Sequence, residues 1–262
     1  MPRVSIGTLD RAVATPPPAG IDGPVEAHAY FNGERDPIHL HVLRVREGSA
    51  LRLDAGDVDR LAYVWEGTVE AGGRLLDKGS SFIVEHGAAL DVAAGDADAA
   101  IVIFWGNRPR TTTLAGGHVR LLPRERVPRI PPNASGTSGA LHSDGSCGTS
   151  ALWLNENSLG GRADAPSPQE AQRGIHAHPE DEIIFVTEGQ VRLGAKLYDR
   201  GTAIAVAANT LYGFSPGPDG VSFITFRSGP ADTIRFAAGG DFVESTYFSG
   251  IKGIDYLEPV GA

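Results

Sequence analysis

The residues best suited to chemistry lie in one short segment, GIHAHPEDEIIFVTEG, at residues 174–189. His176 and His178 are two residues apart, so both imidazoles project from the same face of a strand. Glu182 follows four residues later, after a turn at Pro179 that can return its carboxylate to that face. Two imidazoles and one carboxylate on one side form the 2-His-1-carboxylate arrangement, which leaves coordination positions open for a substrate or dioxygen. The segment therefore predicts a site for one divalent transition metal.

This spacing resembles the first motif of the cupin superfamily, G-x5-H-x-H-x3,4-E-x6-G. His176, His178, Glu182 and Gly189 match the motif, whereas its leading glycine position is occupied by Glu170. The resemblance implies a metal held by the two histidines and the glutamate. Fe(II) is favoured for such a site, and Mn, Ni, Zn or Cu are the alternatives.

The second cupin motif, G-x5-P-x-G-x2-H-x3-N, is retained only at its first position. It maps onto Gly201, Ala207, Asn209, Tyr212 and Pro216, so Tyr212 stands where the family has its fourth ligand, a histidine. A phenol has a pKa of about 10, and direct ligation requires a metal acidic enough to deprotonate it, such as ferric iron or zinc. Three roles are open for Tyr212: metal ligand, acid/base or substrate hydrogen-bonding group, and packing residue.

The same pattern of strands and turns occurs twice in the chain. Residues 63–84 (YVWEGTVEAGGRLLDKGSSFIV) align without a gap on residues 185–206 (FVTEGQVRLGAKLYDRGTAIAV), at an offset of 122. The shared residues are glycines at turns and apolar residues at period two, which is typical of short antiparallel strands. The sequence therefore predicts an all-β fold of two tandem cupin domains, each a jelly-roll β-barrel, and the resemblance covers roughly residues 40 to 230.

The first copy lacks the ligand types. The offset carries the four candidate site positions back to Asp54, Gly56, Arg60 and Leu90. One carboxylate among four positions cannot hold an ion. The N-terminal barrel is therefore expected to be structural or dimer-forming, and only the C-terminal barrel is expected to bind metal.

The composition of the chain suggests three parts. Residues 1–127 form the degenerate cupin, residues 128–150 a Pro/Gly/Ser-rich linker or loop, and residues 151–262 the metal-binding cupin. His142 falls in the linker. We expect it to be a solvated loop histidine, with the supply of a missing metal ligand as the alternative.

A second His-x-His pair, His39 and His41, projects from one face of a strand, but no carboxylate follows at the cupin spacing. An edge-strand or interface role is favoured, with a second metal site as the alternative. Large side chains near the predicted barrel mouth are candidates for the pocket wall, although aromatic residues on such faces more often belong to the core. These candidates are Trp153, Arg192, Phe214 and Phe223.

Charge and composition exclude several classes of partner. The 23 Lys and Arg residues against 32 Asp and Glu residues give a net charge of −9, which disfavours nucleic acid and anionic membranes. The single Cys147 makes no internal disulfide and builds no Cys-rich metal site. There is no apolar run of about 18 residues and no signal-like N-terminus, so a cytoplasmic location is expected.

The residues support three functional hypotheses. The leading one is a metal-dependent bicupin enzyme that acts on a small organic molecule, with a non-haem iron dioxygenase as the favoured type. The second is a non-redox metal-dependent isomerase, lyase or hydrolase that uses Tyr212 as an acid or base. The third is a small-molecule-binding cupin without turnover. The apolar strand faces of two fused barrels also suggest a homodimer or an intramolecular pair of packed barrels.

Overall fold

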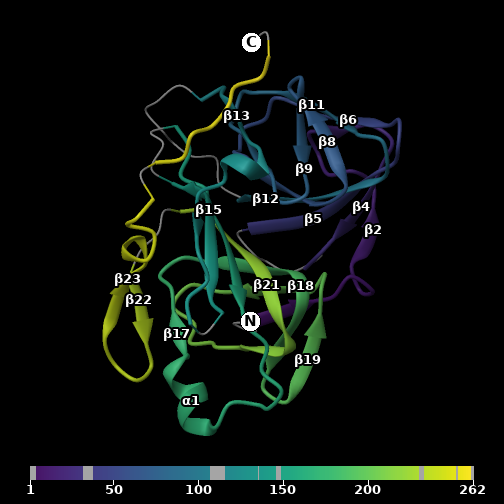
Figure 1. Ribbon diagram of the computed structural model, residues 1–262. Helices are drawn as coiled ribbons and strands as arrows, with labels where there is room; N and C mark the ends of the chain where they lie inside the picture. The colour runs from purple at the N-terminus through teal and green to yellow at the C-terminus, as the bar shows by residue number, and fades with distance from the viewer. Residues whose placement is uncertain are drawn as a thin grey trace. The chain divides into compact units, whose positions relative to one another are not determined.

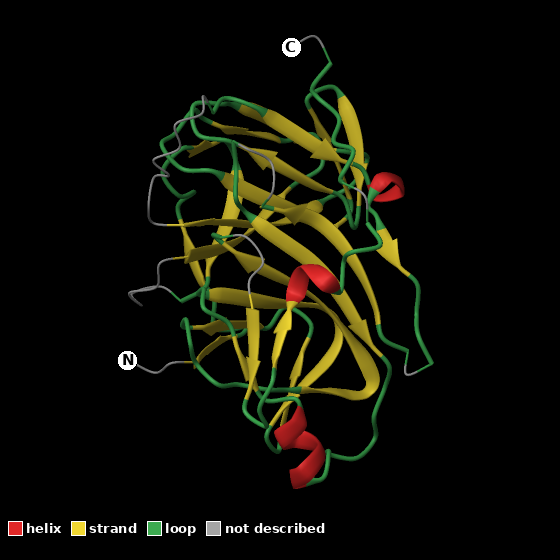
Figure 2. Cartoon of the chain, turned by 90° about the vertical axis from the view of Figure 1, so that its left-hand side faces the viewer, coloured by secondary structure: helices red, strands yellow, loops and turns green. Residues whose placement is uncertain are grey.

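The computed structural model describes residues 4–31, 38–106, 116–134, 136–145, 149–229, 233–251 and 253–260. Strands dominate these segments (Figure 1), and helix is confined to short turns (Figure 2). The predicted all-β class is confirmed. Within the described segments, no helix has the length and apolar character needed to cross a membrane. The helical turns are α1 (Pro168–Arg173), η1 (Arg124–Arg126) and η2 (Glu244–Thr246).

The chain forms two compact units, which we call the N-terminal unit and the C-terminal unit. The N-terminal unit contains the described residues among 11–127, 146–151 and 254–262. The C-terminal unit contains those among 1–10, 128–145 and 152–253. Each unit therefore takes its main body from one half of the chain and a short segment from the opposite end.

The C-terminal unit consists of an antiparallel eight-stranded sheet in the order β1-β20-β18-β21-β16-β15-β14, with β19 paired to β18, and a three-stranded sheet in the order β17-β22-β23. Its buried core includes Ile184, Val186 and Ile204. The strands are β1 (Val4–Gly7), β14 (Arg129–Ile130), β15 (Ser138–Asp144), β16 (Trp153–Leu159), β17 (His176–Ala177), β18 (Glu182–Leu193), β19 (Lys196–Asp199), β20 (Ala203–Val206), β21 (Ser215–Arg227), β22 (Thr233–Phe236) and β23 (Asp241–Val243).

The N-terminal unit pairs a seven-stranded sheet, in the order β13-β10-β7-β12-β5-β4-β2, with a five-stranded sheet in the order β3-β6-β11-β8-β9. Its core includes Leu43, Val64 and Ile101. The strands are β2 (Val13–Thr15), β3 (Ile21–Asp22), β4 (Val25–Ala29), β5 (Ile38–Val45), β6 (Ala50–Leu53), β7 (Arg60–Glu66), β8 (Thr68–Ala71), β9 (Arg74–Asp77), β10 (Ser81–Val84), β11 (Leu90–Ala94), β12 (Ala99–Gly106) and β13 (Val119–Leu122).

The repeated glycines have a common physical cause, which Gly67 and Gly189 illustrate. Their φ angles are +70° and +69°, in the left-handed region that side chains disfavour. A Cβ atom on Gly67 would lie 2.5 Å from the carbonyl oxygen of Asp98, and one on Gly189 would lie 2.3 Å from that of Gly220. Both units therefore turn at the same place, where only glycine fits.

The units differ from the three predicted parts at the linker. Residues 128–145 carry β14 and β15, which extend the large sheet of the C-terminal unit beside β16. His142 lies on β15 and is only 1% exposed, so the expected solvated loop histidine is wrong. The five central residues of the segment SGALHSD are all buried, which its mostly small side chains permit despite the surrounding glycines. Cys147 lies outside the described residues.

The chain ends also differ from the predicted parts. Strand β1 pairs with β20, from Val4 opposite Val206 to Gly7 opposite Ala203, and so belongs to the C-terminal unit. The segment after residue 253 belongs to the N-terminal unit, where Leu257 forms a β-bridge with Leu121.

His39 and His41 occupy an internal strand, because β5 lies between β12 and β4. The edge-strand expectation is therefore wrong. Both imidazoles stack on Trp105, with ring centroids 5.4 and 5.0 Å away. His41 shares its strand face with the core residue Leu43, since the two are two positions apart in the strand. Burial, followed by the charge of His39, lowers the pKa of His41 to about 4.

Candidate functional site

The four site residues predicted from the sequence all line one cavity of the C-terminal unit. The cavity has a volume of about 220 Å³, and His176, His178, Glu182 and Tyr212 are among its lining residues. They come from β17, from the turn after it, from the start of β18 and from the loop between β20 and β21. The first and second motifs therefore converge in space.

Backbone hydrogen bonds bring the two motifs together. The amide of His176 donates to the carbonyl of Tyr212 at 2.9 Å, and the amide of Tyr212 donates back at 3.0 Å. This bridge places the two rings 4.7 Å apart between centroids. The carbonyl of His178 accepts from the amide of Asn209 at 2.7 Å. Asn209 has a φ of +59°, a left-handed conformation that asparagine tolerates better than most residues.

The carboxylate of Glu182 is held by an arginine from the neighbouring strand. Glu182 on β18 lies opposite Arg227 on β21 in the register of the sheet. The Nε atom of Arg227 donates to Oε2 of Glu182 at 3.2 Å. Its Nη2 atom donates to Oε1 of Glu244 at 2.9 Å, and its Nη1 atom donates to Oε2 of the same carboxylate. These side chains are almost fully buried and form one Glu–Arg–Glu cluster, which we call the buried ion cluster.

The hydrogen bonds of His176 determine its tautomer. Its Nδ1 atom lies 2.8 Å from the carbonyl of Gly174, which can only accept, so Nδ1 carries the proton. The Nε2 atom therefore accepts a hydrogen bond from the hydroxyl of Tyr212 at 3.1 Å. A backbone acceptor on one nitrogen that orients the other is the usual support of a metal-binding histidine.

Burial shapes the charges of the site. It lowers the pKa of His178 to about 3, assisted by the positive charge of Arg227, so this imidazole is neutral. It also raises the pKa of Tyr212 well above 10, and the neighbouring charge of Glu182 acts in the same direction. Tyr212 is therefore a neutral phenol at pH 7. Although burial opposes its charge, the hydrogen bonds to Glu244 raise the pKa of Arg227 above its usual value.

The donor set fits a divalent cation, although no three His, Cys, Asp or Glu side chains of the described segments already have the arrangement of a metal centre. The Tyr212 hydroxyl is hydrogen-bonded to Nε2 of His176 in this arrangement. The buried Oε1 atom of Glu182 has no hydrogen-bond partner, and Nε2 of His178 lies 3.8 Å from the other oxygen of that carboxylate. The buried ion cluster has a net charge of −1, from two carboxylates and one guanidinium. A cation would supply the missing partner.

Aromatic residues form most of the remaining wall. Phe214 and Phe223, both predicted as wall residues, line the cavity and contact each other edge-on at 5.1 Å. Trp153 and Arg192 are not among the lining residues. Trp153 is instead buried behind the wall, where it packs on Phe248 with ring centroids 5.6 Å apart. Arg192 donates a hydrogen bond to the carbonyl of residue 163.

Three functional side chains were missed in the sequence: Arg227, Glu244 and Asn155. Phe223, residue 225 and Arg227 alternate along β21, so their side chains share the face that lines the cavity. A charged residue on such a buried face requires a partner of opposite charge. That was a usable signal. Glu244 and Asn155 gave none, because each lies far from the motifs along the chain and meets the site only through the fold.

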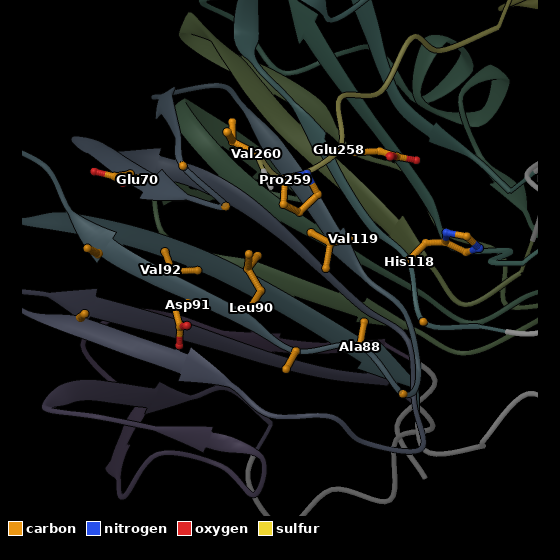
Figure 3. A pocket seen from close by; sticks show the side chains of 17 residues that line it. Glu70, Ala88, Leu90, Asp91, Val92, His118, Val119, Glu258, Pro259 and Val260 are labelled. Carbon is orange, nitrogen blue, oxygen red and sulfur yellow. The ribbon is translucent and has the colours of Figure 1, made fainter. Parts of the chain in front are cut away.

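The N-terminal unit contains a larger cavity, of about 760 Å³, which Figure 3 shows. Segments rich in glycine and alanine line it together with the chain segment Glu258–Val260. In Figure 3 the side chains of Glu70 and His118 lie at opposite sides, so they do not converge on one point. Asp91, also in its lining, is paired with Arg52 at 2.8 Å. This cavity lacks the convergent polar groups of the smaller one.

Comparisons with known proteins identify the fold. No family model and no curated protein matches the chain. Among solved structures, Ylba from E. coli is 15% identical, with a TM-score of 0.61 over 86% of this chain and 90% of that one. Oxalate decarboxylase from Lactobacillus farciminis is 9% identical, with a TM-score of 0.64 over 94% and 90%. A proposed dioxygenase from Nostoc punctiforme is 11% identical, with a TM-score of 0.60 over 88% and 84%. At these identities the likeness shows the fold alone, and it confirms the predicted architecture of two tandem cupin barrels.

Proposed function

We propose that the C-terminal unit is the catalytic part of a metal-dependent enzyme that acts on a small organic molecule, and that the enzyme is an iron-dependent dioxygenase. The observation that carries this proposal is the convergence of His176, His178 and Glu182 on one cavity. Such a donor set leaves coordination positions free for substrate and dioxygen. The shared fold of the oxalate decarboxylase and the proposed dioxygenase adds support.

The three side chains would hold the metal, with Fe(II) favoured and Mn, Ni, Zn or Cu as alternatives for the same donors. When bound, iron would supply the capacity to bind dioxygen next to the substrate. The carbonyl of Gly174 keeps Nε2 of His176 unprotonated and aimed at the cavity. Arg227 fixes one oxygen of Glu182 and leaves the other without a partner.

Tyr212 is positioned to move a proton. Its hydroxyl is neutral and donates to Nε2 of His176 in the metal-free arrangement. If that nitrogen is used for the metal, the hydroxyl is released and becomes a donor for an oxygen atom of the substrate. Phe214 and Phe223 in the wall would limit the access of water to this proton when a substrate fills the cavity.

The neutral phenol also favours a second candidate function, a non-redox metal-dependent isomerase, lyase or hydrolase. In that reaction class the metal polarises the substrate, and Tyr212 serves as the acid or base. Direct ligation by a phenolate is less favoured, because burial and Glu182 both raise the pKa of the hydroxyl.

Metal analysis with a matched control tests the proposed site. The protein should bind about one divalent ion per chain. The double substitution His176→Ala with His178→Ala should abolish binding, while His39→Ala with His41→Ala, the same change at the same spacing in the other unit, should preserve it. If the variant with His176→Ala and His178→Ala still bound one metal ion per chain, the assignment of the metal site to these histidines would be wrong.

Oxygen consumption separates the two candidate functions. The iron-loaded protein is screened with a panel of small organic molecules in an oxygen electrode. Uptake that depends on both iron and one compound supports the dioxygenase. Turnover of a compound without oxygen uptake, measured by product analysis, would reject the dioxygenase in favour of the non-redox reaction.

A further inference from the structure

The size of the site cavity limits what it can hold. Its volume is about 220 Å³. An apolar protein cavity of about 150 Å³ accommodates benzene, whereas drug-sized ligands occupy about 300 to 1,000 Å³. The cavity therefore has room for one six-membered ring with a small substituent.

The wall of the cavity favours a flat apolar ring. Tyr212 and Phe214 lie nearly parallel, with centroids 6.4 Å apart and an interplanar angle of 27°. Phe242, Tyr247 and Phe248 also line the cavity, from β23 and the segment that follows it. Aromatic side chains on several sides favour stacked or edge-on contact with another ring.

The charges of the cavity disfavour a carboxylate ligand. Arg227 is the cationic side chain of the described lining, and three of its five N–H groups donate to Glu182 and Glu244. The bidentate pair with Glu244 and the bond to Glu182 already balance the single positive charge of this arginine. In the metal-free site, the remaining negative charge of the buried ion cluster would repel an anion at low dielectric constant.

Asn155 gives the cavity a directed hydrogen-bond donor. This side chain is 3% exposed and lines the cavity. Its Oδ1 atom accepts from the indole Nε1 of Trp153 at 3.1 Å, and this bond fixes the orientation of the amide. The Nδ2 group is therefore the part of the amide available to a ligand, and it requires an acceptor such as a carbonyl or ether oxygen.

We infer that this cavity, in its metal-free form, takes a small, uncharged aromatic molecule with a single ring that carries one acceptor oxygen. The inference rests on the proposed function and deepens it, because it names the substrate class of the same site. Volume, aromatic wall, committed arginine and oriented amide all point to this class. It differs from the oxalate of the decarboxylases that share the fold, which is a dicarboxylate without a ring.

Binding of two isosteric probes tests the inference. Benzamide and benzoate have the same shape and differ in charge, and oxalate serves as the small anion. Each is titrated by calorimetry into the full chain after removal of metal with EDTA, so that direct contact between a carboxylate and a metal plays no part. We expect benzamide to bind and benzoate to bind at least about tenfold more weakly. Asn155→Leu should weaken benzamide binding by about five- to tenfold.

Glu244→Gln is the decisive variant, because it releases part of the Arg227 guanidinium and removes one negative charge. The affinity of this variant for benzoate should then rise at least about tenfold relative to its affinity for benzamide. Glu85→Gln is the matched control, since Glu85 is also fully buried and paired with an arginine, Arg120 at 3.0 Å, in the other unit. This control should leave the ratio of benzoate affinity to benzamide affinity unchanged.

Three results would overturn the inference: no benzamide binding at 20 mM, benzoate or oxalate binding as tightly as benzamide, or an unchanged ratio in folded Glu244→Gln protein. Metal content is measured separately on the untreated protein. Selective benzamide binding without any metal would refute the proposed enzyme and keep the ligand class. Metal binding without a preference for benzamide over benzoate would refute the ligand class and keep the proposed enzyme.

Discussion

The substitution Arg227→Met removes the only cation of the buried ion cluster while nearly preserving side-chain volume. The guanidinium bonds Glu182 at 3.2 Å and Glu244 at 2.9 Å, and the three residues are 2%, 1% and 6% exposed. Removing one partner of a buried ion pair costs about 3–5 kcal/mol, because a charge remains buried without compensation. Here two carboxylates are left, so we expect the upper part of this range for the metal-free protein.

Urea unfolding measures this loss. With a slope of about 2 kcal/mol per molar urea, the midpoint of the C-terminal unit should fall by roughly 2 M. Trp153 reports on this unit, since its ring lies 5.8 Å from the guanidinium carbon of Arg227. Arg162→Met is the control, because Arg162 forms an exposed pair with Glu170 at 2.9 Å that is worth about 0–1 kcal/mol.

Two further measurements test whether charge is the cause. Arg227→Met combined with Glu244→Gln should recover at least half of the loss, because one carboxylate disappears. A saturating divalent metal should stabilise Arg227→Met more than the unaltered protein, since the ion replaces the missing cation. A loss below about 1 kcal/mol in Arg227→Met, or a double variant less stable than the single one, would refute the reasoning.

Three other predictions concern single residues. Tyr212→Phe should retain metal, because a neutral phenol is not needed as a ligand, and should lower turnover by about 10²- to 10⁴-fold; loss of metal by elemental analysis would show instead that the oxygen ligates. His41 has a pKa of about 4 in the folded chain against about 6.5 unfolded, so the unfolded state binds more protons as the pH falls. Its contribution is present well above pH 6.5, and about 2 kcal/mol of stability is lost between pH 7 and pH 5. His41→Gln should remove this loss from the pH profile of urea unfolding, and an unchanged profile in the variant would show that another group causes it. Gly189→Ala should cost at least about 2 kcal/mol more than Gly194→Ala, since both glycines have positive φ but only the first would place a Cβ atom against backbone; equal costs by thermal unfolding would contradict this.

The parts of the fold that follow local rules could be predicted from the sequence. Period-two alternation and turn glycines such as Gly67 and Gly189 depend on a few neighbouring residues, and they predicted the strands and the repeat. The spacing of His176 and His178 is also local, and both residues line one cavity with Glu182.

What could not be predicted depends on pairings between distant segments. Arg227 meets Glu182 only because β18 and β21 are neighbours, and Glu244 joins them from beyond the last sheet strand of the barrel. His142 sits in a glycine- and serine-rich stretch that resembles a linker by composition. Its burial depends on β16, which provides the hydrogen bonds that this composition does not reveal.

The exchange of chain ends between the two units has a consequence for the order of synthesis. Strand β1 leaves the ribosome first, yet its partner β20 is made about 200 residues later. At about 5–20 residues per second, β1 waits roughly 10–40 s before it can pair. The N-terminal unit is completed later in synthesis, because Leu257 forms its bridge to Leu121. A chain interrupted before β20 therefore leaves β1 without its partner strand, and an unpaired strand is a template for pairing with another chain.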